Sequence, residues 1–445
     1  MRNYLFILLS SFILLCCTVK QENTKTVYSQ QMVEKRVLKT FLSNKREQQL
    51  STAKWDYVPG LVANSVLKAW QQYPEKTEYY NTVKAYADFC LQGADTIHVE
   101  DSNIDDLAAG KIFFALYQHE LTLGNTAAAE RYKHCATYLR NKLKYEHERI
   151  ADSKPGAGGF FHKAKYPNQI WLDGLYMGAA LYAEWQHYFG EELGTQDNTE
   201  SWTDIAKQFK IIHHYTYDSE KKLNYHAWSA DPSDPNSFWA NKESPYVGCS
   251  PEFWGRGMGW YFAALVDVLD FMPKTHEDYK TLVEITQDVA EGLALYQDAT
   301  SGCWYQLLQY DSTKTANNIG DFYCNKIYNV CDKPNYVESS ASSMFTYAYL
   351  KGIRIGILDK ETYMPIAKKA YSGLIETFIR NNENGELDII QSCASAGLGP
   401  KNDISRTGTI NYYLCGKDVH RTKNEGKAIG PFIMASLEWE MTNGE

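Results

Sequence analysis

Helical periodicity recurs along almost the whole of this 445-residue chain, and it is the feature that most limits the folds open to it. Apolar residues return every three or four positions in about twelve segments, whereas the alternation typical of strands is scarce. Turn-forming Gly, Pro, Asn and Asp residues separate the segments. The pattern predicts helices over residues 31–48, 60–72, 78–93, 105–122, 126–145, 168–189, 200–216, 256–271, 276–297, 337–356, 361–380 and 427–441.

The predicted helices are of two kinds, which alternate along the chain. Some, such as 170–188, are apolar nearly all round, while others, such as 126–145, carry an Arg and Lys face. A helix between a central core and an outer helix needs apolar residues on every side, and an outer helix needs one apolar stripe. We therefore expect an all-α (α/α)6 double-ring barrel of about twelve helices, formed as a single domain by residues 31–445. The Trp-rich segment 217–255 would be a loop at one mouth of the inner ring.

The N-terminus has the pattern of a secretory signal. Arg2 precedes a short apolar run, 5–15, which is too short for a permanent membrane span, and Cys16 and Cys17 follow at once. We expect residues 1–17 to be a signal peptide, with a cysteine that suggests a lipoprotein. Residues 18–30 would be a polar tether. The protein would then be exported, to the periplasm or as an outer-membrane-anchored lipoprotein, and would meet a membrane only through such a lipid anchor.

Composition and cysteine spacing narrow the classes of partner. The formal net charge of −9, with no basic block, argues against nucleic acid. Aromatic residues make up 14% of the chain, which suits either a large helical core or the faces of sugars. Eight cysteines follow the signal segment without a Cys-x-x-Cys pair, so a zinc site is not expected. Cys324 and Cys331 are the nearest candidates for a disulfide, but buried free thiols are the favoured interpretation.

Two acidic residues that open apolar helices are candidates for acid–base chemistry. Asp173 is the lone carboxylate in an aromatic stretch, so burial beside Trp171 would raise its pKa toward the range of a general acid. Asp105 opens an earlier helix, with Asp106 as its competitor. Facing each other across a pocket, Asp105 and Asp173 would keep one proton between them through mutual repulsion. Taken singly, each aspartate is better explained by helix capping or by the helix dipole.

A glycine-rich segment, residues 254–260 (WGRGMGW), combines features of a sugar-binding site. Its glycines let the backbone approach a ligand, Trp254 and Trp260 offer stacking surfaces, and Arg256 can bond to a carboxylate or to sugar hydroxyls. No Gly-Lys-Ser/Thr follows, so the segment is not a phosphate loop. A glycine-rich turn that begins a helix is the alternative.

Two histidines and a lysine could contribute to the same site. His162 lies eleven residues before Asp173, and His226 lies within the Trp-rich segment. Either could donate to a substrate oxygen, although a lone histidine is more often structural. An acidic protein repels an acidic ligand at long range, so positive groups must gather at the site. Arg256, Lys163 and His162 are the candidates.

A serine run follows Glu338 and opens a predicted helix, with serines at 339, 340, 342 and 343. Serines in this position usually cap the helix. The free N–H groups of the first turn could also hold a carboxylate.

Taken together, these segments resemble glycoside hydrolase family 105, the unsaturated rhamnogalacturonyl hydrolases, with kinship to the unsaturated glucuronyl hydrolases of family 88. The resemblance runs from about Trp55 to Glu440. It is carried by residues 54–57 (KWDY), 103–105 (NID), 159–163 (GFFHK), 166–177 (YPNQIWLDGLYM), 253–261 (FWGRGMGWY), 338–342 (ESSAS) and 430–432 (GPF). The family implies an (α/α)6 barrel with no metal and no cofactor.

The resemblance also implies a reaction, the hydration of a C4=C5 unsaturated uronate that polysaccharide lyases leave at the non-reducing end of an oligosaccharide. Asp173 would be the general acid that protonates C4 and the base that activates water to attack C5, after which the glycosidic bond opens. Asp105 would help to hold the substrate and tune its partner. The expected substrate-binding residues are Tyr57, His162, Lys163, Trp171, His226, Trp254, Arg256 and Trp260.

Two other classes of protein share parts of this pattern. Another (α/α)6 enzyme, such as an endo-acting hydrolase or a polysaccharide lyase, would use an open cleft, or a Tyr or His base often with calcium. A non-catalytic helical carbohydrate-binding lipoprotein would keep the tryptophans but would not need Asp173 or Asp105. Loss of the ultraviolet absorbance of lyase products identifies the hydrolase.

Overall fold

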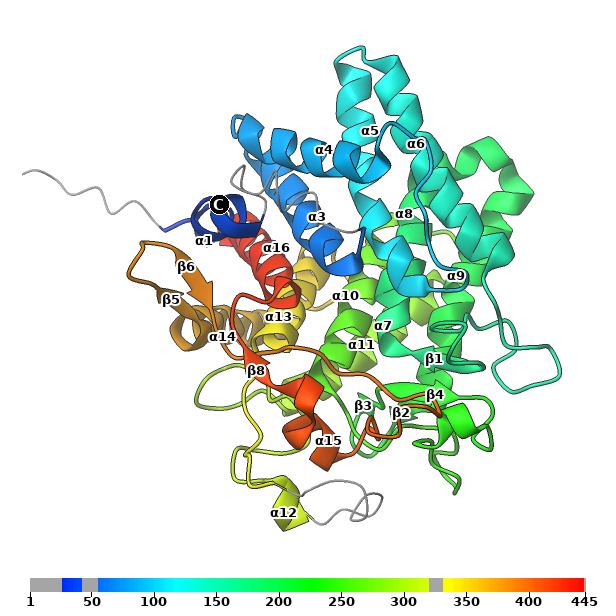
Figure 1. The fold of residues 1–445 in the computed structure, drawn as a ribbon, viewed down its shortest axis with the longest axis vertical. Coiled ribbons are helices and arrows are strands. Elements are labelled where there is room, and N and C mark those ends of the chain that lie inside the picture. The colour runs from blue at the N-terminus through cyan, green and yellow to red at the C-terminus, as the bar shows by residue number, and fades with distance from the viewer. Residues whose placement is uncertain (1–25, 42–54, 320–330, 444–445) are drawn as a thin grey trace, which may run out of the picture.

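The computed structural model describes residues 26–41, 55–319 and 331–443, which are mostly helical (Figure 1). The predicted signal peptide, residues 1–17, lies outside the described residues. Within them an inner ring is formed by α3 (Tyr57–Gln72), η3 and α5 (Ile104–Lys111, Ile112–Thr122), α7, η5 and α8 (Leu172–Gly174, Leu175–Ala179, Ala180–Phe189), α10 (Gly255–Phe271), α13 (Ser339–Arg354) and α16 (Gly426–Asn443). Each inner segment contacts the next, and α16 closes the ring against α3.

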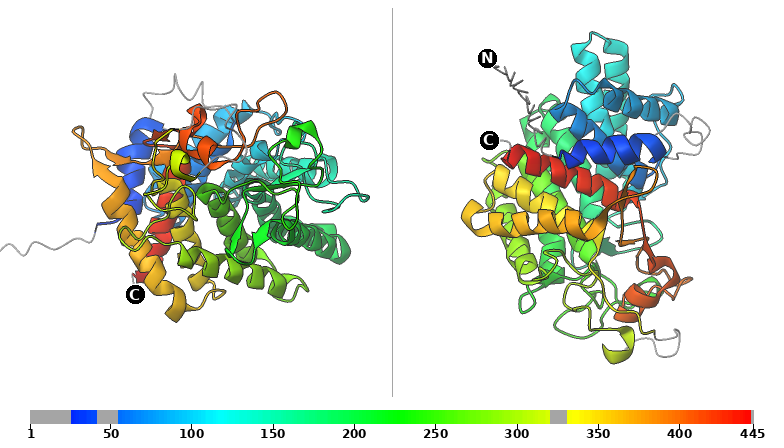
Figure 2. Two further views of the ribbon diagram at one scale, coloured as in Figure 1. Left: turned by 90° about the horizontal axis from the view of Figure 1, so that it is seen from below. Right: turned by 90° about the vertical axis from the view of Figure 1, so that its left-hand side faces the viewer.

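An outer helix packs against each inner segment. The outer ring consists of α1 and η1 (Tyr28–Met32, Val33–Phe41), α4 (Thr77–Leu91), α6 (Thr126–Asn141), α9 (Thr195–Thr216), α11 (Tyr279–Leu295) and α14 (Lys360–Phe378). The right-hand view in Figure 2 shows α14, α13 and α16 side by side. The predicted (α/α)6 double-ring barrel is confirmed.

The burial of two helices shows why the chain makes two rings. Inner helix α10 buries every residue from Gly255 to Leu269. Outer helix α6 buries a single stripe, at Ala129, Tyr132, Cys135, Ala136, Leu139 and Arg140. This spacing of three and four residues places the stripe on one face of the helix. The alternation of the two kinds of helix therefore decides which ring each joins.

Short strands account for the main differences from the predicted helices. The segment 168–189 begins as strand β1 (Gln169–Trp171), which pairs antiparallel with β4 (Ala227–Ser229), and the helix starts only at Leu172. At the N-terminus, α1 begins at Tyr28, inside the segment expected to be a tether. Ser29 is buried there and donates to Glu440 of α16, so residues 28–30 pack against the barrel.

The remaining elements are short. The other sheets of the described residues pair β2 (Tyr217–Asp218) with β3 (Leu223–Asn224), β5 (Ile379–Asn381) with β6 (Leu387–Ile389), and β7 (Ser392–Cys393) with β8 (Arg421–Thr422). The short helices are η4 (Lys142–Glu146), η6 (Gly190–Leu193), η7 (Pro235–Ser237), α12 (Ala316–Ile319), α15 (Ile410–Cys415) and η8 (Lys417–Val419). In Figure 1 the strands β1 to β4 and helix α15 gather toward the lower end.

One disulfide joins Cys331 to Cys415, with Cα atoms 6.0 Å apart and 84 residues of separation. The expectation of free thiols is wrong for these two cysteines, because the fold places the segment that precedes α13 beside the end of α15. The alternative, a disulfide between Cys331 and Cys324, is also wrong, since Cys331 is bonded to Cys415; Cys324 lies outside the described residues. Cys90, Cys135, Cys249, Cys303 and Cys393 are free thiols, as expected.

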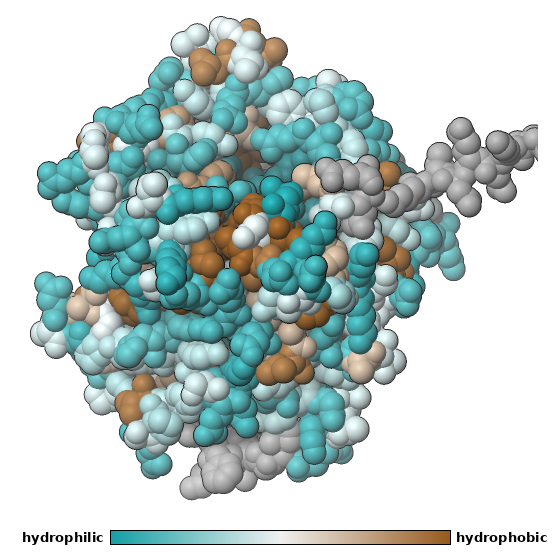
Figure 3. Space-filling view, turned by 180° about the vertical axis from the view of Figure 1, so that it is seen from behind, coloured by the Kyte–Doolittle hydropathy of each residue, from teal (hydrophilic) through white to brown (hydrophobic). Residues whose placement is uncertain are grey.

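The surface is mainly polar on the face turned away from the viewer of Figure 1. Figure 3 shows that hydrophilic residues cover most of this face, around a central apolar patch. None of the described helices is both long and apolar enough to cross a membrane.

Candidate active site

A cavity of about 200 Å³ lies at the end of the inner ring where the inner helices begin. It is lined by nine of the ten predicted site residues: Tyr57, Asp105, His162, Lys163, Trp171, Asp173, Trp254, Arg256 and Trp260. His226, the tenth, lies behind Asp173. The pocket is completed by residues that the sequence did not single out: Lys165, Tyr166, Met177, Ser395, Ala396, Gly397 and Arg406. Tyr166 and Met177 belong to the motif at 166–177, but no sequence pattern marked the wall at 395–406.

Asp173 reaches the pocket because the chain changes from strand to helix just before it. Trp171 ends β1, and Asp173 is the second residue of α7. The N–H of Leu172 donates to the carbonyl oxygen of His226 at 3.0 Å, which fixes the two segments together. His226 is fully buried, and its Nε2 lies 2.9 Å from Oδ2 of Asp173.

The pKa of Asp173 departs from the predicted direction. Burial is the largest influence and raises this pKa, but the charge and the hydrogen bond of His226, together with the charge of His162, hold it below its usual value. The prediction of a raised pKa beside Trp171 is therefore wrong. Trp171 instead stacks on His162, with ring centroids 4.3 Å apart.

Asp105 faces the same pocket in an ion pair. Lys163 Nζ lies 2.6 Å from Asp105 Oδ2, and the bridge between Asn103 and Lys163 brings the two segments together. Because Lys163 balances the charge of Asp105, repulsion between the two aspartates is not the main influence on Asp173, contrary to the prediction. The competitor Asp106 accepts a hydrogen bond from the backbone N–H of Glu100 at 2.9 Å.

His162 does not supply the positive charge that was expected of it. Burial lowers the pKa of His162 to about 4, so the ring is neutral at neutral pH. Its Nε2 lies 3.7 Å from Asp105 Oδ1, and its Nδ1 has no partner among the described residues. With Lys163 paired to Asp105, a ligand meets positive charge at Arg256 and at Lys165, which both line the pocket.

Arg256 is a buried guanidinium that forms no ion pair with a carboxylate of the described residues; burial lowers its pKa, but nearby Cys393 and Glu338 raise it above the usual value. It lies in the first turn of α10, is 2% exposed, and sits over the ring of Trp254 at 4.8 Å. Nη1 donates to the carbonyl oxygen of Cys393 at 2.5 Å and more weakly to Ser340 Oγ. Nε has no acceptor, and no carboxylate of the described residues forms an ion pair with the guanidinium. Since a buried charge is costly unless it is paired, this arrangement suits an anionic ligand.

The serine run does not hold a ligand carboxylate, contrary to our hypothesis. Glu338 caps α13 and accepts hydrogen bonds from the N–H groups of Ser340, at 3.1 Å, and Ala341, at 2.7 Å. It also accepts from the N–H of Cys393 at 2.8 Å. The first-turn N–H groups are therefore occupied by a residue of the chain itself, which also fixes the strand that bonds to Arg256.

The tryptophans form walls of the pocket rather than open platforms. Trp254 is 1% exposed and packs against His226, with ring centroids 4.7 Å apart. Trp260 is 2% exposed and packs on Tyr176 at 4.8 Å. Each therefore presents only a small part of its ring to a ligand.

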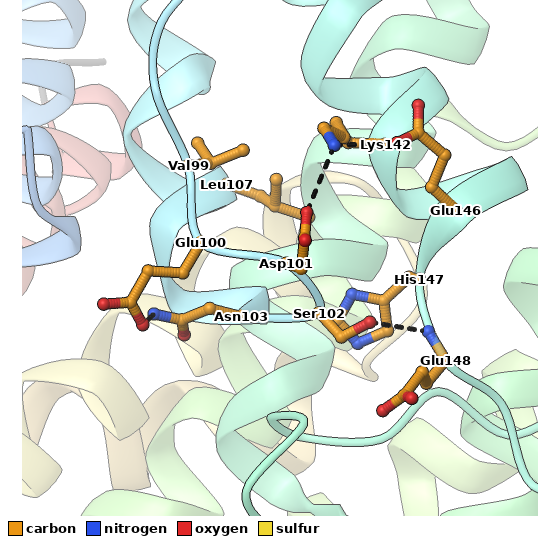
Figure 4. Close-up of a pocket in the computed structure, with 10 residues that line it drawn as sticks. All are labelled: Val99, Glu100, Asp101, Ser102, Asn103, Leu107, Lys142, Glu146, His147 and Glu148. Carbon is orange, nitrogen blue, oxygen red and sulfur yellow. Dashed lines mark hydrogen bonds and ion pairs between the residues drawn. The ribbon is translucent and has the colours of Figure 1, made fainter.

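A second hollow, of about 310 Å³, lies beside the segment that leads into Asp105 (Figure 4). Lys142 bonds to Glu146 at 2.7 Å within it, and Figure 4 shows the side chains of Glu100 and Asn103 turned away from this pair. The hollow is lined by Val99, Glu100, Asp101, Ser102, Asn103, Leu107, Lys142, Glu146, His147 and Glu148.

In the described part of the chain, no three His, Cys, Asp or Glu side chains are grouped to hold a metal ion.

Two concentric rings of helices enclose a pocket with two carboxyl groups, aromatic walls and a buried arginine. These features define a carbohydrate-active (α/α)6 enzyme. The sequence profile of Glycosyl Hydrolase Family 88 matches residues 29–320 and 325–443. The chain therefore belongs to this family of glycoside hydrolases.

Individual relatives agree with this assignment. A glycoside hydrolase of family 105 from C. acetobutylicum ATCC 824 has a solved structure that is 33% identical, with a TM-score of 0.76 over 94% of this chain and 100% of that chain. A protein of Agrobacterium fabrum (strain C58) is 33% identical over 208 residues, which are 46% of this chain and 77% of that protein. The unsaturated rhamnogalacturonyl hydrolase YesR of Bacillus subtilis (strain 168) is 25% identical over 254 residues, 57% of this chain and 64% of that protein. The resemblance to families 105 and 88 is confirmed.

Proposed function

We propose that the protein removes a C4=C5 unsaturated uronic acid from the non-reducing end of oligosaccharides made by polysaccharide lyases, by hydrating the double bond. The observation that carries the proposal is Arg256, a buried positive charge that lines the pocket of Asp173 and has no carboxylate partner among the described residues. The carboxylate of a uronate supplies that partner, because a guanidinium binds a carboxylate through two parallel hydrogen bonds. The activity for which YesR is named supports the same class of substrate.

The size of the pocket favours a terminal sugar over an internal one. Its volume of about 200 Å³ is below the range of about 300–1,000 Å³ for sites that enclose drug-sized ligands. Such a site suits one sugar ring at the end of a chain. An endo-acting enzyme would need an open cleft on both sides of the cleaved bond.

The proposed reaction begins with the protonated carboxyl group of Asp173. Asp173 donates its proton to C4, the electrons of the double bond form the new C–H bond, and positive charge develops at C5 and the ring oxygen. Water attacks C5 while Asp173, now a carboxylate, takes a proton from that water. The resulting hemiketal opens at the bond between C5 and the ring oxygen. The hemiacetal left at C1 releases the rest of the oligosaccharide as an alcohol, so one water is consumed and the acid is regenerated.

This role requires the pKa of Asp173 to rise when the substrate binds, because His226 and His162 hold it low in the free protein. A bound sugar excludes water from the carboxyl group, and the uronate adds a second negative charge nearby. Both effects favour the protonated form of Asp173.

The test is the ultraviolet absorbance of the unsaturated uronate, which disappears on hydration. The protein should abolish the absorbance of lyase-generated oligosaccharides, and a panel derived from galacturonate and glucuronate will identify the preferred sugar. Asp173→Asn should remove the activity and leave the helical circular dichroism intact. Asp106→Asn, a matched change of an aspartate that bonds to backbone outside the pocket, should keep it. A near wild-type rate for Asp173→Asn would contradict the proposal.

A further inference from the structure

Tyr413 forms the buried end of a chain of hydrogen bonds that leads to Asp173. It lies on α15, is fully buried, and its hydroxyl oxygen is 2.7 Å from Nδ1 of His226. The other nitrogen of His226, Nε2, is 2.9 Å from Oδ2 of Asp173. The order Tyr413–His226–Asp173 therefore joins residues that are 187 and 53 positions apart in the sequence.

The position of Tyr413 is fixed from several sides. Its carbonyl oxygen accepts a hydrogen bond from Gln306 Nε2 at 2.8 Å, and its ring stacks on Trp254 with centroids 5.9 Å apart. Two residues further on, Cys415 is tied by the disulfide to Cys331. The hydroxyl is thus held against the imidazole by packing, by a backbone hydrogen bond and by a covalent link.

The hydroxyl of Tyr413 keeps its proton and has one place to donate it. Burial raises the pKa of Tyr413 well above its ordinary value, so the phenol stays protonated. Among the described residues, its only hydrogen-bond partner is Nδ1 of His226. Electrostatic interactions with Tyr412, Asp173 and Glu252 raise the pKa of Tyr413 further. A proton on Nδ1 would leave the phenol hydrogen buried without an acceptor, which is unfavourable.

Resting on the proposed role of Asp173 as general acid, we infer that Tyr413 is a positioning residue that sets the tautomer of His226 and thereby the oxygen of Asp173 that carries the acid proton. With Nδ1 accepting from Tyr413, the neutral imidazole carries its proton on Nε2 and donates to Oδ2 of Asp173. Oδ2 is then an acceptor, so the acid proton resides on Oδ1. In the opposite tautomer a bare Nε2 accepts the carboxyl proton from Oδ2, and the acid is directed away from the substrate.

The experiment removes only the hydroxyl, with Tyr413→Phe. The fraction of enzyme with the productive tautomer should fall, so kcat should decrease by about 10- to 100-fold while KM stays within about twofold. Tyr349→Phe is the matched control, because Tyr349 is an equally buried tyrosine whose hydroxyl donates to the carbonyl oxygen of Ala290 away from the pocket. That variant should keep the wild-type kcat.

A spectroscopic measurement tests the tautomer directly, in the wild-type protein itself. In protein labelled with ¹⁵N-histidine, the His226 signals are those lost in His226→Gln. At a pH at which the imidazole is neutral, the wild-type protein should show a proton on Nε2 and a bare Nδ1, and Tyr413→Phe should shift the signals toward the form with a proton on Nδ1. A proton on Nδ1 in the wild-type protein overturns the inference, as does an unchanged kcat or a loss confined to KM in Tyr413→Phe.

The two proposals fail in different ways. An inactive Asp173→Asn enzyme beside a fully active Tyr413→Phe enzyme would remove only the inference about Tyr413. An active Asp173→Asn enzyme would remove the proposed function and this inference with it.

Discussion

Replacing Arg256 with methionine tests whether the buried guanidinium is there for the substrate or for the fold. In the complex, Arg256→Met leaves the uronate carboxylate buried without its partner, which costs about 2–5 kcal/mol. Since about 1.4 kcal/mol corresponds to a factor of ten, kcat/KM should fall between about 30-fold and several thousand-fold. The assay is the initial rate of absorbance loss with an unsaturated disaccharide.

The same change should not weaken the free protein by more than about 1 kcal/mol. Arg256→Met loses the hydrogen bond to Cys393, worth about 1 kcal/mol. It also removes a buried charge that has no carboxylate partner in the described structure, and replacing buried ionic groups by apolar ones is often neutral or stabilising by about 1–4 kcal/mol. Urea denaturation should therefore show a stability between about 1 kcal/mol below and about 3 kcal/mol above the wild-type value.

Two controls make the result decisive. Arg140→Met changes an equally buried arginine, which bonds to Ser201 and sits over Trp185 outside the pocket, so it should leave kcat/KM unchanged. The methyl ester of the disaccharide lacks the carboxylate. The kcat/KM of the wild-type enzyme should therefore fall from the acid to the ester by the same factor that Arg256→Met loses on the acid. An Arg256→Met enzyme that keeps kcat/KM within threefold, or one that is clearly destabilised, would refute the reasoning.

Further predictions concern pH, the disulfide and the cap of α13. A general acid must carry a proton, so activity should fall as pH rises through the pKa of Asp173. This fall should come at lower pH for kcat/KM, which reports the free enzyme, than for kcat, which reports the enzyme with substrate bound. Coincident pH profiles of kcat/KM and kcat would contradict the prediction. Cys331→Ser with Cys415→Ser should lower the free energy of unfolding by about 2–5 kcal/mol in urea, and equal stability would argue against the link. Glu338→Ala should cost about 1–3 kcal/mol by the same measurement, because it leaves the N–H of Cys393 unpaired; a neutral effect would exclude that role.

The double ring could be predicted because its cause is local. Whether a helix is apolar on one face or all round is readable within about twenty residues, and α6 and α10 show the two outcomes. The start of the helix that contains Asp173 was misplaced because Gln169–Trp171 pairs as a strand with Ala227–Ser229. No sequence pattern in either segment indicates that the two pair.

The pocket could be predicted as a set of residues, but not its electrostatics. Asp173 and Arg256 stand in distinctive motifs, and the ring brings the start of each inner helix to one end. The pKa of Asp173 depends on His226, which approaches it from another loop, and the ion pair of Asp105 depends on the position of Lys163. Tyr413 lies still further along the chain, in a short helix with no motif of its own. Such pairwise distances are set by the finished fold rather than by local pattern.

The parallel arrangement of the inner helices gives the backbone a part in recognition. The pocket takes Tyr57, Asp105, Asp173 and Arg256 from the opening turns of four of them, so their N-terminal ends converge on it. At α3 and α10, which begin as regular α-helices, this end carries a partial positive charge of about half a unit, contributed by peptide dipoles. A protein with a formal net charge of −9 thereby presents a locally favourable field to an anionic sugar. Because this field belongs to peptide groups, no side-chain replacement abolishes it.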